Sequence, residues 1–253
     1  MFVIKNIVMR VLIKQICFLA LSILFMGSAY AEENPGDYPQ KGKKNVLMVG
    51  GGGSHDFQKW YGEVDLKLIN SMEGMHAIYT ENTDSIKHYL KNTDLLILTN
   101  NQPISAESQQ AIEKFVAKGK PLVLLHAALW YNWEDWPKYN KEYVAGGSTS
   151  HEDYGEFNTI VVNPIHPINK GVTQQFPIKD ELYRHIPDAD SKGIEVLAIG
   201  QSKVTSEVFP VVFVVKHSKS KIVGITLGHD AESHLLEPYK ALLVNSIEWV
   251  FNK

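Results

Sequence analysis

The chain has 253 residues, of which 44% are hydrophobic and 21% are charged, and its formal net charge is -3. This is the composition of an ordinary globular protein, and it excludes a disordered, collagen-like or coiled-coil chain. The balance of 25 basic against 28 acidic residues argues against a dedicated nucleic-acid-binding protein, which usually carries a basic excess. A single cysteine excludes an intramolecular disulfide and any multi-cysteine zinc or iron–sulfur site.

Residues 1–31 have the pattern of a secretory signal peptide. Three basic residues and no acidic residue flank the start of the apolar stretch Ile16–Phe25, and Ala29-Tyr30-Ala31 supplies an A-x-A cleavage site. An uncleaved membrane anchor is disfavoured, because a span needs about 20 apolar residues. We therefore expect a periplasmic or secreted protein that is free of the membrane after cleavage. Loss of the three positive charges changes the net charge from -3 to -6 and also removes the only cysteine.

The remaining chain divides into a polar leader, residues 32–44, and a single α/β domain, residues 45–253. In the first half of this domain, short apolar runs alternate with segments of helical periodicity. Strands are predicted at Asn45–Val49, His76–Thr80, Asp94–Thr99 and Pro121–Leu125. Helices are predicted after the first strand, between the second and third, and from an N-cap at Ser105 to a stop near Gly119. This alternation predicts a mostly parallel sheet with helices on both faces.

The second half of the domain is less regular. Further strands are predicted at Phe157–Val162, Ile194–Ile199, Val211–Val215 and Ile222–Leu227, and loops at Pro167–Gly171 and Pro177–Glu181. A final helix is predicted from apolar residues at three-to-four spacing, which are Leu235, Tyr239, Leu242, Leu243, Ile247 and Val250.

Histidines follow three of the predicted strands. His55 comes after the first strand, His126 directly after the fourth, and His229 after the strand Ile222–Leu227. Ligands of open α/β sheets bind beyond the carboxyl ends of the parallel strands, so the three imidazoles are expected to open onto one rim. The alternative is that each histidine only packs within its own loop. Three histidines at corresponding positions favour a site.

Two of these turns exclude familiar chemistries. Gly50–Gly53 lacks the Lys-Ser/Thr of a Walker motif and does not fit G-x-G-x-x-G, so the glycines are expected to let the backbone turn tightly. The turn Leu125-His126-Ala127-Ala128 contains no Ser, Cys or Thr, so no acyl-enzyme is expected there. An imidazole at this turn can act as a general base, a proton donor or a metal ligand. As a rim residue, His126 is expected to support little of the core.

Seven short segments together carry a family resemblance. They are Gly52-Gly53-Ser54-His55-Asp56-Phe57, Leu125-His126-Ala127-Ala128, Gly146-Gly147-Ser148 with His151, Tyr154-Gly155-Glu156-Phe157, His166-Pro167-Ile168, Asp180-Glu181-Leu182-Tyr183 and Gly228-His229-Asp230. In this order they are similar to the ThuA-like (trehalose-utilisation) family. The resemblance implies a flavodoxin-like fold, as in class I glutamine amidotransferases, and a link to carbohydrate metabolism. Because His126 stands where those enzymes have their cysteine, glutaminase activity is not expected.

The matching segments extend the candidate site. Glu181 and Tyr183 suit proton transfer or the binding of sugar hydroxyls, and a buried hydrogen-bonded network is the alternative. Aromatic side chains after His126 suit stacking on a sugar ring, with core packing as the alternative. The candidate catalytic residues are His126, His229, His55, Glu181 and Tyr183. The candidate substrate-binding residues are Asp56, His151, Trp130, Trp133 and Asp230.

Two classes of function remain open from the sequence. The first is an enzyme that acts on a small carbohydrate, a sugar or an oxidised (keto) glycoside, by proton transfer next to a carbonyl or by metal-assisted hydrolysis. For metal-assisted hydrolysis, His55, His126 and His229 would hold zinc or a similar divalent ion. The other class is a non-catalytic sugar-binding or accessory protein. An enzyme is expected to show clustered titratable groups with perturbed pKa values in one pocket.

Overall fold

The computed structural model describes residues 38–130 and 134–252, so the predicted signal segment lies outside the described residues. Part of the predicted leader is attached to the domain. The Tyr38 hydroxyl lies 2.6 Å from Thr93 Oγ1, and Lys44 is already the first residue of β1 (Lys44–Val49). Within the described ranges, no helix combines the length and the apolar character that a membrane span requires.

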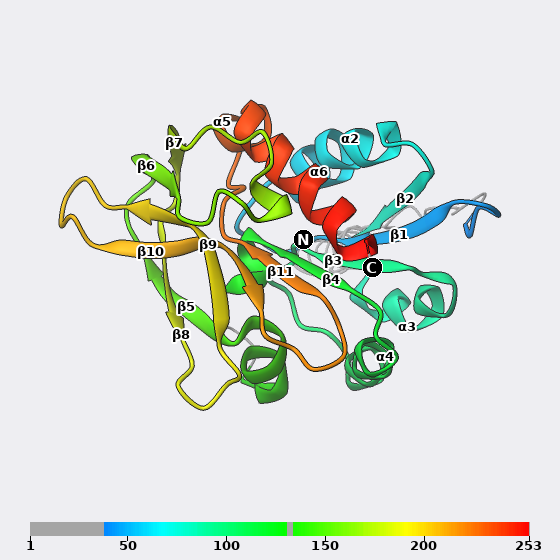
Figure 1. Ribbon diagram of the computed structural model, residues 1–253. Coiled ribbons are helices and arrows are strands. Elements are labelled where there is room, and N and C mark those ends of the chain that lie inside the picture. The colour runs from blue at the N-terminus through cyan, green and yellow to red at the C-terminus, as the bar shows by residue number, and fades with distance from the viewer. Residues whose placement is uncertain (1–37, 131–133, 253) are drawn as a thin grey trace, which may run out of the picture. The chain divides into compact units, whose positions relative to one another are not determined.

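A nine-stranded sheet forms the centre of the domain (Figure 1). Its order is β2-β1-β3-β4-β11-β10-β9-β6-β7. The strands besides β1 are β2 (Met75–Thr80), β3 (Leu95–Leu98), β4 (Leu122–Leu125), β6 (Gly155–Val161), β7 (Gln175–Asp180), β9 (Ile194–Gln201), β10 (Val208–Val215) and β11 (Ile222–Ile225). Strands β2, β1, β3, β4 and β11 are parallel, in the order of a flavodoxin-like sheet. From β11 to β7 each neighbour is antiparallel.

All eight predicted strands form, but the prediction of a loop at Pro177–Glu181 is wrong. Residues 175–180 form β7, in which Pro177 pairs with Asn158 of β6. β7 is an edge strand, and no strand lies on its outer side. Edge strands tolerate proline, because a missing N–H on the outer side removes no hydrogen bond between strands. Side chains alternate between exposed and buried along β7, as expected for a strand with one covered face.

Helices cover both faces of the parallel half, as predicted. One face carries the π-helix η1 (Gln58–Asp65), α2 (Leu66–Ser71), α5 (Ala231–His234) and α6 (Glu237–Phe251); the other carries η2 (Thr83–Ser85), α3 (Ile86–Tyr89), η3 (Leu90–Asn92), α4 (Ala106–Ala117) and η5 (Tyr139–Val144) (Figure 1). Alternate residues of β1 belong to different cores: Val46 and Met48 are in the core that includes residues of α6, and Leu47 and Val49 are in the core that includes residues of α4. The short helices η4 (His126–Leu129) and η6 (Pro167–Asn169) complete the set in the described ranges.

Two details of the predicted helices differ from expectation. Ser105 occupies the N-cap position of α4, but its side chain makes no capping hydrogen bond and its buried Oγ has no partner in the described part of the chain. Leu235 is not on the apolar face of the last helix. α6 begins only at Glu237, because Pro238 favours the first turn, and Leu235 before it is 55% exposed.

A small second sheet was not predicted. β5 (Gly146–His151) pairs antiparallel with β8 (Tyr183–Pro187). β5 begins Gly-Gly-Ser-Thr-Ser and has no large apolar side chain, so neither hydrophobic alternation nor β-propensity marks it as a strand. The register places His151 opposite Tyr183, which brings two of the candidate site residues together.

Candidate functional site

The three histidines that follow parallel strands lie together. His55 is in the glycine-rich loop after β1, His126 follows β4 and His229 follows β11. The His55 ring centroid lies 4.7 Å from that of His126 and 4.7 Å from that of His229, and the His126 and His229 centroids are 5.8 Å apart. The carboxyl ends of the parallel strands therefore form one centre, as the rim rule requires.

Glu181, between β7 and β8, supplies a carboxylate to the same centre. Its Oε2 lies 3.3 Å from His229 Nδ1 and 3.6 Å from His126 Nε2. One ligand atom from each of His55, His126, Glu181 and His229 lies within 4.8 Å of every other. We call these four residues the histidine–glutamate cluster.

His126 is held in a strained and fully buried conformation. Its φ is 41°, which is uncommon for a residue with a large side chain and typically costs about 1 kcal/mol or more. Its side chain is 0% exposed, and Nδ1 lies 2.6 Å from the carbonyl oxygen of Thr226. The prediction that His126 supports little of the core is therefore wrong, because the strand leads the ring inward under Tyr183 instead of outward to the rim.

The environment of the cluster shifts several pKa values. Burial lowers the pKa of His55 to about 3, and the charges of His126 and His229 act in the same direction. Burial alone would raise the pKa of Glu181, but its contacts with His126 and His229 hold that pKa below its usual range. The contact with Glu181 raises the pKa of His229 against the effect of burial. Burial also raises the pKa of Tyr183, so its phenol is neutral at pH 7.

A pocket of about 240 Å³ opens onto the cluster. It is lined by Ser54, His55, Asn101, Trp130, His151, Glu181 and Tyr183. The Trp130 ring lies 5.4 Å from His151 and 5.2 Å from Tyr183, so three rings form one side of the pocket. The predicted residue Trp133 lies outside the described residues.

The comparisons with known proteins agree with this fold. A family model described as ThuA, trehalose utilisation, matches residues 45–250. The chain belongs to the ThuA family. No curated protein matches the sequence at a significant level.

Solved structures of ThuA-like proteins share the fold. One from Parabacteroides merdae has a TM-score of 0.71 at 19% identity, covering 82% of this chain and 90% of that chain. One from Bacteroides uniformis has a TM-score of 0.71 at 22% identity, covering 84% and 94%. The glutaminase domain of Trypanosoma brucei CTPS has a TM-score of 0.51 at 7% identity, covering 81% and 94%. The predicted ThuA-like, glutamine-amidotransferase-like fold is thus confirmed.

Asn101, which was not predicted, forms part of the pocket of this ThuA-family chain. It follows β3, and its Nδ2 donates to Ser54 Oγ at 2.7 Å. Gly52 has a φ of 134°, and a Cβ there would lie 1.8 Å from Asn101 Oδ1, so the loop requires glycine at this position. The rim rule applies to β3 as well as to β1 and β4, and it could have identified Asn101.

A second missed group, Asp180, joins the elements that carry the cluster. The Asp180 side chain is fully buried. Its Oδ1 accepts from the backbone N–H of Glu181 at 2.7 Å, and its Oδ2 accepts from that of Gly228 at 2.8 Å and from the Ser233 hydroxyl. Asp180 therefore fixes both Glu181 and the turn before His229.

Asp56 and Asp230 do not line the pocket, and their carboxylates are engaged elsewhere. Asp56 is exposed, and its Oδ1 accepts from the backbone N–H of Lys59 at the start of η1. Asp230 is the N-cap of α5, accepts from Glu232 N, and also accepts from the Tyr154 hydroxyl at 2.7 Å. These two residues, which neighbour His55 and His229 in the sequence, therefore stabilise the starts of η1 and α5.

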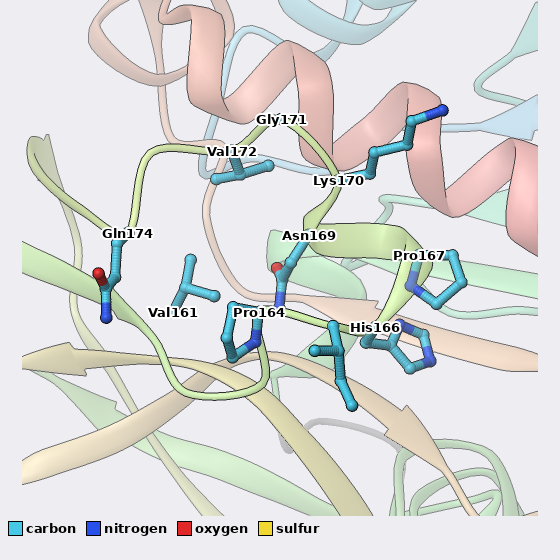
Figure 2. Close-up of a pocket in the computed structure, with 10 residues that line it drawn as sticks. Val161, Pro164, His166, Pro167, Asn169, Lys170, Gly171, Val172 and Gln174 are labelled. Carbon is cyan, nitrogen blue, oxygen red and sulfur yellow. The ribbon is translucent and has the colours of Figure 1, made fainter.

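A larger hollow of about 620 Å³ lies away from the cluster, within residues 161–174. Figure 2 shows Val161, Asn169 and Gln174 around it, with His166 and Pro167 at one end. None of the predicted catalytic or substrate-binding residues lines this hollow. His166 Nδ1 accepts from Ile168 N at 3.3 Å, so this side chain caps the start of η6. The smaller pocket is therefore the candidate active site, because only it adjoins the clustered titratable groups.

Proposed function

We propose that this ThuA-family protein is an enzyme of carbohydrate metabolism that moves a proton next to the carbonyl of a sugar or keto-glycoside. The observation that carries the proposal is the histidine–glutamate cluster at the base of a pocket, with shifted pKa values at His55, Glu181 and His229. A protein that only binds sugars needs aromatic and neutral polar groups, and a cluster of buried titratable side chains adds nothing to that binding. A catalyst needs groups whose protonation states are set by their surroundings.

Two histidines have their tautomers fixed in the same way. His126 Nδ1 lies 2.6 Å from the Thr226 carbonyl, and His151 Nδ1 lies 2.7 Å from the Glu152 carbonyl. A carbonyl oxygen only accepts, so Nδ1 is the protonated nitrogen in each ring and Nε2 of the neutral ring carries a lone pair. We assign removal of the substrate proton to His151, which lines the pocket and is 35% exposed, rather than to the fully buried His126.

The other pocket groups suit an electrophilic role. The neutral Tyr183 hydroxyl lies 3.2 Å from His126 Nε2 and can turn to donate to a substrate oxygen. In the proton-transfer step the carbon next to the carbonyl loses its proton to His151, and the negative charge develops on the carbonyl oxygen, where Tyr183 and the cluster stabilise it. The enolate then takes a proton back from His151.

Three features support a carbohydrate as the substrate. The family model is described by trehalose utilisation. The pocket combines the Trp130 ring with the polar pair Ser54 and Asn101, and sugars present both apolar faces and hydroxyls. Its volume of about 240 Å³ lies below the range of about 300–1,000 Å³ for drug-sized ligands, which favours one sugar ring inside it.

Solvent deuterium exchange tests the proposed reaction. Candidate 3-keto sugars incubated with wild-type protein in D₂O are expected to gain deuterium next to the carbonyl, as read by NMR. The variant His151→Ala is expected to slow exchange about 10²–10⁴-fold, since it removes a positioned base, and His88→Ala, at an exposed histidine, is expected to match wild type. If wild type binds these sugars and neither exchanges nor cleaves them, the accessory-protein alternative is correct.

We also propose that the protein is exported, on the pattern of residues 1–31. Intact-mass measurement of protein from the native host is expected to show a chain that begins at Glu32. A full-length mass in the soluble fraction would contradict export.

A further inference from the structure

We infer that His55, His126, Glu181 and His229 bind one divalent ion of the first transition row. The inference deepens the proposed function, because it concerns the same pocket, and it rests on the positions of the four side chains and their partners. It also explains why His126 is buried at the base of the site and not exposed at its rim.

The separations match those between ligands that share one metal ion. Two ligands of a tetrahedral ion at 2.0–2.1 Å are about 3.4 Å apart. Glu181 Oε2 lies 3.3 Å from His229 Nδ1 and 3.6 Å from His126 Nε2. All four ligand atoms lie within 4.8 Å of one another.

The ring nitrogens are available in the form that a metal requires. The Thr226 carbonyl holds the proton of His126 on Nδ1, so Nε2 carries the lone pair. The Tyr183 hydroxyl lies 3.2 Å from this nitrogen and turns away when Nε2 coordinates an ion. His55 Nδ1 is buried and has no hydrogen-bond partner in the described part of the chain. His229 Nδ1 is also buried, and its contact with Glu181 lacks hydrogen-bond alignment. Buried polar atoms without partners are uncommon, and a shared cation would satisfy those of His55 and His229.

The residues behind the ligands hold them in place. Asp180 accepts from the backbone of both Glu181 and Gly228, so one buried carboxylate fixes two of the four ligands. Gly228 has a φ of 129°, and a Cβ there would lie 2.7 Å from the Tyr61 hydroxyl, so the turn before His229 requires glycine at this position. Such outer contacts orient metal ligands and raise metal affinity.

The ligand set defines the class of ion. Three imidazoles and one carboxylate suit Zn²⁺, Fe²⁺, Ni²⁺ or Mn²⁺, whereas Mg²⁺ and Ca²⁺ prefer oxygen ligands throughout. A divalent ion with one carboxylate leaves the centre with one net positive charge. Because His55 and Glu181 also line the pocket, that charge faces the position of the substrate oxygen and favours an anionic oxygen there.

Metal content measured on the whole protein tests the inference. Protein stripped with a chelator and incubated with Zn²⁺, Mn²⁺ or Mg²⁺ separately is expected to bind one Zn²⁺ or one Mn²⁺ per chain by elemental analysis after dialysis, and no Mg²⁺. Glu181→Gln and His229→Ala are expected to weaken metal binding more than about 100-fold. Loss of a residue that only hydrogen-bonds to a ligand already lowers metal affinity about 10–100-fold. His151→Ala and the exposed His88→Ala are expected to bind like wild type.

Each outcome separates this inference from the proposed reaction. If folded wild-type protein, checked by circular dichroism, takes up no transition-metal ion, or if both ligand variants keep wild-type affinity, the inference is wrong. Deuterium exchange by wild-type protein that takes up no transition-metal ion would overturn the inference and leave the proposed reaction intact. Stoichiometric metal without exchange would support the inference and overturn the reaction.

Discussion

Replacement of His234 by alanine is expected to lower the free energy of unfolding by about 3–5 kcal/mol, because it leaves a buried charge without its partner. His234 and Asp65 are both 0% exposed, and His234 Nδ1 lies 2.9 Å from Asp65 Oδ1. His234 Nε2 lies 3.0 Å from the Gly228 carbonyl, and the Tyr239 hydroxyl donates to Asp65 Oδ2. Both ring nitrogens face acceptors, so the ring is a doubly protonated imidazolium. Urea unfolding of His234→Ala measures the loss.

The loss is also expected to depend on pH. Burial alone would lower the pKa of His234, but the Asp65 carboxylate outweighs burial and raises it. A raised folded-state pKa means that the contribution of His234 is complete below its unfolded pKa of about 6.5 and is lost as pH rises through the folded value. The difference between wild type and His234→Ala is therefore expected to shrink in alkaline solution.

The exposed variant His88→Ala provides the control for this experiment, with an expected change within about 0.5 kcal/mol. If His234→Ala does not fold, His234→Gln keeps one amide donor for Asp65 and permits the same titration. A difference that stays constant or grows from pH 6 to pH 9 would show that His234 is neutral in the folded protein.

The parallel half of the sheet could be predicted because its signals are local. β1, β3 and β4 are short runs that are buried on both faces, so apolar residues are continuous in the sequence and turn residues bound them. Each strand end then places the next polar residue at the same rim, which is how His55, His126 and His229 were identified.

The remaining parts depend on contacts between distant segments. Asp65 and His234 are separated by 169 positions and have no motif around them, so their pairing is visible only in the folded chain. Glu181 follows an antiparallel edge strand, to which the rim rule does not apply, and only the family resemblance pointed to it. β5 and β8 owe their pairing to the surrounding domain, since the Gly-Gly-Ser start of β5 carries no strand signal of its own.

Replacement of His126 by asparagine is expected to abolish turnover while leaving the fold in place. Alanine is a poorer test than asparagine, because the buried Thr226 carbonyl would lose its donor and a cavity would remain. Asparagine tolerates the positive φ of 41° at this position, and its amide can donate to Thr226 in place of Nδ1–H. What it lacks is the lone pair that His126 Nε2 directs at the cluster.

The size of the effect follows from the role of the cluster. Removal of one group that stabilises the developing oxyanion typically costs about 10²–10³-fold in rate, and loss of the whole charged centre costs more. Deuterium exchange and metal content, measured on the same His126→Asn preparation, separate the two chemical roles of this residue. Loss of both shows that His126 is a ligand. Loss of exchange with full metal content shows that His126 takes part in the proton transfer, as a base or proton donor, and not as a ligand. Wild-type exchange would remove His126 from the mechanism altogether.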